Sequence, residues 1–159
     1  GKLGLPIQFH TGIQAGPGND LGRSNPMLLL PLIQKHPDTR FVLFHGSFPY
    51  MAELGVLAKN YRNVFIDMCW MPVISPLESR QWLERWLETV PVNKIMAFGG
   101  DYLFPEGTYA HSRMARQVAA EALCEKVLSG VLTPEEAIWT ARRLLRENAI
   151  ECFNLQRFL

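Results

Sequence analysis

Four short apolar runs alternate with helix-like segments, and this alternation restricts the fold to a small set of architectures. The runs cover residues 5–10, 41–45, 64–68 and 94–98. The second run is nearly continuous in apolar residues, as expected of a strand that is covered on both faces. Strands that alternate with helices form a parallel sheet with right-handed crossovers. Four such units predict an α/β fold, either an open sheet or half of an eight-stranded barrel, which typically needs about 250 residues.

The helices are predicted from apolar periodicity and from capping residues at their ends. We expect them over about residues 25–36, 50–59, 75–90, 109–129 and 133–147. Asn25 precedes a proline at the first helical position, which is a common start. Ser75 and Thr133 are each followed by Pro and, three residues later, by Glu, which is the pattern of a capping box. Gly130 ends the long fourth helix, as glycine often does.

The bulk properties are those of one globular domain, spanning residues 1–159. The chain is 48% hydrophobic and 19% charged, and its net charge of +1 gives no indication of a nucleic-acid partner. No apolar stretch approaches the roughly 20 residues of a membrane span, and residues 1–4 lack a signal-peptide core. Three widely spaced cysteines, without a CxxC pair, predict reduced thiols in a cytoplasmic protein rather than a disulfide framework or a nucleophile.

Three metal-type side chains stand where predicted strands end. His10 and His45 each close an apolar run, and Asp101 follows the run 94–98 after two glycines. In a parallel barrel, side chains from different strand ends converge on one face and build the active site there. The alternative to a site is that His10 and His45 are hydrogen-bonded core histidines and that Asp101 caps the loop that follows it. Two histidines and one carboxylate also fit the facial triad of non-haem iron enzymes.

Further candidates lie on the loops that follow the strands. The long loop 12–23 is expected over the mouth of the site, where Arg23 would hold a substrate carboxylate or lie in solvent. Trp70 and Tyr102 are predicted either to line a substrate pocket or to pack between layers. Asp67, within the third run, is a candidate to support a metal-bound histidine. His111 is expected near the mouth, in a capping or surface position.

Four motifs carry a resemblance to a known family over essentially the whole chain. They are QFHTG at 8–12, LFHG at 43–46, FGGD at 98–101 and ARRLLRENA at 141–149. The chain resembles the C-terminal half of the amidohydrolase superfamily, and is most similar to its amidohydrolase 2 branch, which also resembles uronate isomerase. The resemblance implies strands five to eight of a metal-dependent (β/α)8 TIM barrel, followed by C-terminal helices.

The resemblance also implies roles for the strand-end residues. His10 would be a metal ligand, His45 a ligand or a general acid/base, and Asp101 a group that contacts the metal or its water. Asp101 and His45 would be catalytic. The implied activity is hydrolysis of an amide, ester or lactone bond of a small molecule, with a divalent metal, Zn or alternatively Mn or Fe. A decarboxylase, a uronate-type isomerase and a catalytically silent truncated module are the alternatives.

One element of the family pattern is missing from this sequence. The first barrel strand of the family carries a His-x-His pair, whereas no two histidines here are two residues apart. Strands one to four are therefore not represented. We expect an N-terminal half-barrel or a homo-oligomeric partner to complete the site, and we expect the isolated chain to be inactive.

Overall fold

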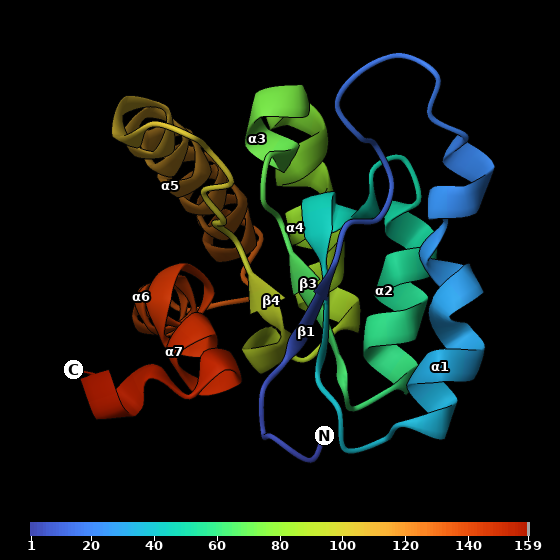
Figure 1. Cartoon of the computed structure of the whole chain (residues 1–159). Helices are drawn as coiled ribbons and strands as arrows, with labels where there is room; N and C mark the ends of the chain where they lie inside the picture. The colour runs from blue at the N-terminus through green and yellow to red at the C-terminus, as the bar shows by residue number, and fades with distance from the viewer. Residues whose placement is uncertain (159) are drawn as a thin grey trace.

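The computed structural model describes residues 1–158 and contains one four-stranded parallel sheet (Figure 1). Its strands are β1 (Ile7–Phe9), β2 (Phe41–Leu43), β3 (Val64–Asp67) and β4 (Ile95–Met96), in the spatial order β1-β2-β3-β4. All three neighbouring pairs are parallel, so the predicted sheet and its sequential order are confirmed. The strands are shorter than the apolar runs because the chain leaves the sheet before the candidate site residues.

Helices of several types connect and flank the strands. They are η1 (Leu21–Ser24), η2 (Pro26–Leu29), α1 (Leu30–Lys35), η3 (Phe44–Ser47), α2 (Met51–Asn60), α3 (Met71–Ile74), α4 (Pro76–Thr89), η4 (Val92–Lys94), α5 (Pro105–Leu128), α6 (Pro134–Arg142), the π-helical η5 (Arg143–Glu147), α7 (Asn148–Phe153) and η6 (Leu155–Phe158). The five predicted helices are all present. The first starts as a 3₁₀ turn, the fourth begins earlier than expected, and the fifth ends in a π turn that continues into α7.

The predicted caps are mostly those observed. Asn25 accepts a hydrogen bond from the backbone of Met27 at 2.9 Å, and Thr133 forms a complete capping box. Ser75 accepts from the backbone of Glu78 at 3.2 Å. The reciprocal half of that box is missing, because the Glu78 carboxylate accepts a hydrogen bond from the Trp82 indole instead. These local bonds satisfy amide groups that a helix start otherwise leaves without partners.

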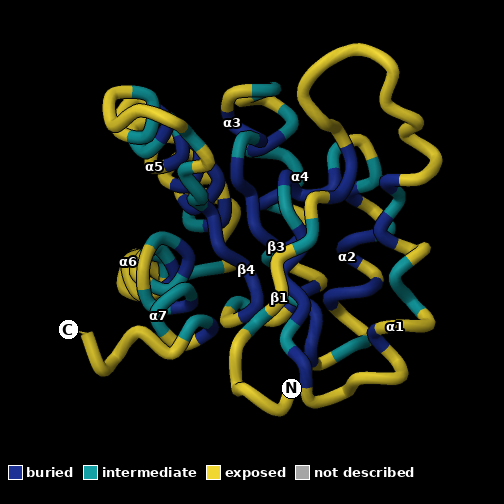
Figure 2. Tube along the Cα trace, viewed as in Figure 1, coloured by how far each residue is buried: buried dark blue, intermediate teal, exposed yellow. Residues whose placement is uncertain are grey.

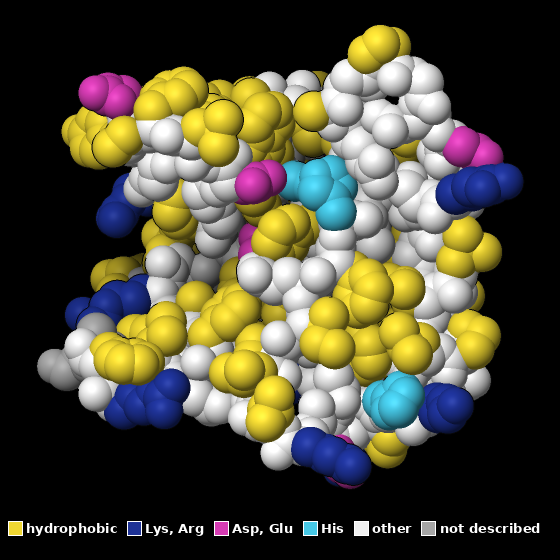
Figure 3. Space-filling view, in the orientation of Figure 1, with side chains coloured by type: hydrophobic (Ala, Val, Ile, Leu, Met, Phe, Trp, Pro, Cys, Tyr) yellow, Lys and Arg dark blue, Asp and Glu magenta, His cyan; other side chains and the backbone are white. Residues whose placement is uncertain are grey.

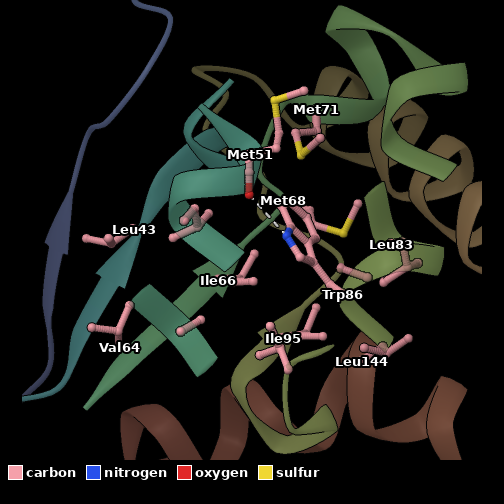
Figure 4. Close-up of a cluster of buried hydrophobic side chains, with 14 of the residues drawn as sticks. Leu43, Met51, Val64, Ile66, Met68, Met71, Leu83, Trp86, Ile95 and Leu144 are labelled. Atoms are coloured by element: carbon pink, nitrogen blue, oxygen red, sulfur yellow. Dashed lines mark hydrogen bonds between the residues drawn. The ribbon is translucent and has the colours of Figure 1, made fainter. Parts of the chain in front are cut away.

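The main core lies between one face of the sheet and the helices α2, α4 and α5. Leu43, Ile66 and Ile95 project from the strands into this layer, and all three are fully buried. Trp86 of α4 fills its centre, and its indole nitrogen donates to the Met51 carbonyl at 3.2 Å (Figure 4). This packing holds the carboxyl ends of the strands in a common register, which positions the loops that follow them.

The opposite face of the sheet is only partly covered. Val42 and Met96 pack there against Cys152 of α7. The cover ends toward β1, which is coloured partly as exposed in Figure 2. Leu5 and Ile7 are 55% and 44% exposed, and within the described residues β1 pairs with β2 alone. The sheet therefore stays open, as half of a barrel does.

The helices and the cysteines were also compared with the predictions for a membrane span and for disulfide bonds. Among residues 1–158, no helix combines the length and the apolar character that crossing a membrane requires. Cys69, Cys124 and Cys152 are all free thiols, in agreement with the prediction of reduced cysteines.

Candidate metal centre

The side chains of His10, His45 and Asp101 converge at the carboxyl end of the sheet. One ligand-type atom from each lies within 4.8 Å of the other two. His10 and Asp101 are exposed, whereas His45 is buried. In the space-filling view, histidine and acidic side chains meet above the sheet (Figure 3). The expected convergence is thus confirmed as geometry, because the parallel strands deliver their last residues to the same edge.

The two imidazoles face each other through their Nε2 atoms, which are 2.8 Å apart. The Nδ1 atom of His45 lies 2.9 Å from the Cys69 carbonyl oxygen, and a carbonyl only accepts. His45 therefore carries its proton on Nδ1, which leaves the Nε2 lone pair free for a proton or a cation. Burial holds the pKa of His45 below its usual range, which favours this neutral form.

The backbone at three strand ends adopts left-handed conformations. The φ angles are 58° at His45, 63° at Trp70 and 49° at Asp101. Residues with a Cβ atom rarely adopt this region, and such strain is concentrated at functional sites. The left-handed turns redirect the chain immediately after the strands, so that side chains of three successive strand ends share one side of the molecule.

The loops after β1 and β2 are tied together beneath the two histidines. Thr11 donates its hydroxyl hydrogen to the Phe44 carbonyl at 3.1 Å and lies 2.8 Å from the Ser47 hydroxyl. A Cβ atom at Gly12 would stand 2.2 Å from the Phe48 carbonyl oxygen, so only glycine permits this approach. These contacts bring His10 next to its partner on the neighbouring strand.

An aromatic group supports the loop that carries Asp101. The Trp70 indole nitrogen donates to the Asp101 carbonyl at 3.0 Å. Its ring stacks on Tyr102, with centroids 5.3 Å apart. Tyr102 in turn makes an edge contact with His111. Trp70 therefore links the end of β3 to the end of β4, in addition to any contact that it makes with a substrate.

A cavity of about 210 Å³ opens beside the three converging side chains. Its lining consists of His10, Ile13, Gln14, Ala15, His45, Trp70, Ile74 and Asp101. The start of the loop 12–23 therefore covers the mouth, as expected. Tyr102 stands behind Trp70 and does not line the cavity. Arg23 is also outside the lining, since it is exposed and pairs with Asp20 at 3.2 Å, so its substrate role stays a prediction.

Two residues near the site differ from the expectations drawn from the sequence. His111 is buried, with 1% of its surface exposed, so the expectation of a capping or surface histidine is wrong. The Phe98 and Tyr102 rings cover it. The second residue is Cys69, whose carbonyl orients His45. Sequence reasoning missed it because any residue type offers that carbonyl.

The donor set fits a divalent cation. Metal–nitrogen and metal–oxygen bonds are about 2.0–2.2 Å long, so two ligand atoms on one ion lie at most about 4.4 Å apart. The two Nε2 atoms satisfy this limit, and the atoms of all three residues lie within 4.8 Å of one another, a span slightly above it. Two imidazoles and a carboxylate suit Zn, Mn or Fe. The bond from His45 Nδ1 to a backbone carbonyl is the support that metal-bound histidines ordinarily have.

Comparisons with known proteins agree with this architecture. The chain is 33% identical to the protein fluG of Emericella nidulans over 151 residues, which cover 94% of this chain and 17% of fluG. It is 25% identical to the uronate isomerase of Cutibacterium acnes over 147 residues, which cover 87% of this chain and 31% of that enzyme. The chain thus spans less than a third of either curated relative.

A solved structure shares the fold. It is a Lactobacillus casei protein provisionally assigned as a metal-dependent hydrolase, and it superposes with a TM-score of 0.82 at 21% identity. The match covers 99% of this chain and 41% of that protein. The family model described as amidohydrolase matches residues 1–155, which is nearly the entire sequence. The chain therefore belongs to the amidohydrolase family.

Proposed function

We propose that the protein containing this chain is a metal-dependent hydrolase that cleaves an amide, ester or lactone bond of a small molecule with water. The observation that carries the proposal is the convergence of His10, His45 and Asp101 beside a cavity. Membership in the amidohydrolase family supports it. We assign a Zn²⁺ ion as the cofactor, since two imidazoles and one carboxylate are typical zinc donors.

The site residues have different proposed roles in cation binding, proton transfer and positioning. A divalent cation, when bound, lowers the pKa of water and polarises a carbonyl group. His10 and His45 would hold the cation through Nε2, and the Cys69 carbonyl keeps the second imidazole in the required tautomer. Asp101 is exposed at the cavity and accepts the proton of the attacking water as general base. Trp70 holds the backbone of this aspartate in place.

The cavity lining bears on the choice between a hydrolase and an isomerase. The likeness to uronate isomerase makes isomerisation of a sugar acid the second candidate. A sugar acid carries a carboxylate, which proteins usually bind with Arg or Lys. Among the described residues that line the cavity, none is Arg or Lys, and Ile13, Ala15 and Ile74 are apolar. This lining favours hydrolysis over isomerisation of a sugar acid, and Trp70 offers a flat surface for the substrate.

The open sheet supports a second part of the proposal. An N-terminal half-barrel or another protomer covers the exposed strand β1 and completes the site. Leu5 and Ile7 are exposed large hydrophobic residues, and hydrophobic side chains spread over the face of the molecule seen in Figure 3. A large exposed apolar patch marks an interaction surface, and an unpaired strand edge invites pairing. We also place the protein in the cytoplasm, which the three free thiols support.

Metal titration tests this proposal. Isothermal titration calorimetry with Zn²⁺ should give one strong site in the intact protein and a weaker one in residues 1–159 alone. The His45→Ala variant should lose at least ten-fold in affinity, while His36→Ala, which removes an exposed histidine far from the site, should not. Equal Zn²⁺ affinity in wild type and His45→Ala would make the proposed metal site wrong. Turnover of a hexuronate, without cleavage of simple esters, would replace the hydrolase by the isomerase.

A further inference from the structure

Asp67 is a buried carboxyl group close to the candidate metal centre but outside its ligand set. It is the last residue of β3 and is 5% exposed. Alternation along the strand places it on the same face as Phe65, which packs with Val42 and Met96. Burial, followed by the negative charge of Asp101, raises the pKa of Asp67 to about 7. A buried carboxyl among apolar side chains is costly, which indicates a specific use.

The carboxyl group shapes the chain reversal that follows β3. Its Oδ1 atom accepts a hydrogen bond from the Cys69 backbone nitrogen at 2.9 Å. A bond from an aspartate side chain to the backbone two residues later defines an Asx turn. The carbonyl of the same Cys69 residue then lies 2.9 Å from His45 Nδ1. Asp67 is thus connected to the His45 imidazole, which follows β2, through one residue with a hydrogen bond on either side.

The segment that follows β4 packs against Asp67 and Cys69. A Cβ atom added to Gly99 would stand 2.8 Å from Asp67 Oδ1 and 2.7 Å from the Cys69 Cβ atom. Since real Cβ atoms do not approach this closely, the contact requires glycine at position 99. The carboxyl group of Asp67 therefore lies where the ends of β2, β3 and β4 meet, and the Cys69 carbonyl has little freedom to move.

We propose that Asp67 is a positioning residue for His45: by fixing the Cys69 turn, it selects the imidazole tautomer that presents Nε2 to a cation. Asp67 itself touches neither the cation nor the substrate. The tautomer part of this inference rests on the two hydrogen bonds of Cys69. The consequence for metal affinity rests on the proposed function, in which His45 is a ligand.

The decisive comparison is between variants that keep and variants that lose the acceptor. Asp67→Asn retains an oxygen that accepts from Cys69, and it is neutral like the protonated acid. Asp67→Leu keeps a branched side chain of similar reach but has no acceptor. Asp67→Ala serves as a second such variant if the leucine side chain does not fit. Asn63→Ala is the control: Asn63 is also buried, at the other end of β3, and donates to Ile33 and His36 carbonyls.

Two measurements on the intact protein distinguish positioning from general stabilisation. Long-range ¹H–¹⁵N correlation spectra of the metal-free protein report which ring nitrogen of His45 carries the proton. Calorimetric titration with Zn²⁺ reports the affinity. In Asp67→Leu we expect a mixture of tautomers and a Zn²⁺ affinity lower by about 10- to 100-fold, the usual effect of removing a group that orients a ligand. Asp67→Asn should restore both within a few-fold, and Asn63→Ala should lower only thermal stability.

The inference is overturned if both acceptor-free variants keep the single Nδ1–H tautomer and the wild-type Zn²⁺ affinity. It is equally overturned if Asn63→Ala changes the tautomer as much as they do, because general loosening of the fold would then be the cause. A wild-type protein with no Zn²⁺ affinity would contradict the proposed function instead. In that case the tautomer spectra alone decide whether Asp67 positions His45.

Discussion

The two ends of the parallel sheet use polar groups in opposite ways. Three buried side chains donate to backbone carbonyls near the amino ends of β3 and β4: Asn63, Lys94 and Asn148. The acceptors belong to neighbouring helices and turns and to β4 itself, as in the bonds from Lys94 to Tyr61 at 2.7 Å and from Asn148 to Ile95 at 2.7 Å. At the carboxyl ends, polar side chains meet one another, and His10 and His45 are held in direct contact. The backbone there is left-handed at His45 and Asp101.

The polar groups at the amino ends of the strands contribute to stability, whereas those at the carboxyl ends are available for chemistry. Donors at the amino ends have each found a fixed backbone partner, so they lower the free energy of the folded chain and leave little reactivity. Side chains at the carboxyl ends retain lone pairs for a cation or a proton. Parallel barrels divide these tasks in the same way, with stability at one end of the sheet and catalysis at the other. Three substitutions probe the division, in order of expected effect.

The largest effect is expected at Asp101. Asp101→Asn should lower turnover of the intact protein by about 10²- to 10⁴-fold, the usual contribution of a general base. The fold should persist, because asparagine tolerates the left-handed conformation at this position. Steady-state kinetics and thermal unfolding measure the two effects. Glu106→Gln, at an exposed carboxylate of the first turn of α5, is the control. Wild-type turnover in Asp101→Asn with metal bound would remove Asp101 from the chemistry.

The second effect concerns the pH dependence of stability at Asp67. Its pKa is about 7 in the folded chain and 3.8 in the unfolded one. The folded state therefore binds the proton more tightly, so the stabilisation is complete below pH 3.8 and is lost as the pH rises through 7. At about 1.4 kcal/mol per pKa unit, the loss is on the order of 4 kcal/mol.

Urea unfolding of the metal-free protein between pH 4.5 and pH 8 tests this dependence. Relative to Asp67→Asn, which cannot ionise, wild type should lose stability as the pH rises. A free-energy difference between the two proteins that is independent of pH would show that Asp67 does not titrate in this range.

The smallest effect is expected at the amino ends. Asn148→Ala removes two hydrogen bonds, to the Val92 and Ile95 carbonyls, at 2.6 and 2.7 Å. Leaving buried carbonyls without a partner should lower the free energy of unfolding by about 1–3 kcal/mol. Zn²⁺ affinity and turnover below the unfolding temperature should not change. Asn19→Ala, in an exposed loop, should leave both stability and affinity at the wild-type level. A loss of Zn²⁺ affinity in Asn148→Ala would contradict the division between the two ends.

Much of the fold was predictable because its signals are local. Thr133 with Glu136 forms the complete capping box that its sequence pattern predicts. The alternation of apolar runs and helical segments predicted the parallel sheet, and the sheet in turn predicted where His10 and Asp101 would meet. These inferences succeed because periodicity and capping depend on residues a few positions apart.

Other features depend on contacts between distant segments. The π-helical turn Arg143–Glu147 was not predicted, and in it the Leu144 carbonyl accepts a hydrogen bond from Ala97, beyond the end of β4. His111 was expected at the surface, but the Phe98 and Tyr102 rings bury it. In both cases the deciding partner lies outside the helix concerned, and the periodicity of that helix does not report it.

The residue types at the strand ends can be read directly from the sequence, and they identify the edge of the sheet that carries imidazole and carboxylate groups. How these groups are presented depends on the folded chain: the Nδ1–H tautomer of His45, the left-handed backbone at Asp101, and the contact of Asp67 with the Cys69 turn. Backbone carbonyls and amides, which every residue possesses, make these selections. Their positions follow from packing, and side-chain identity does not record them.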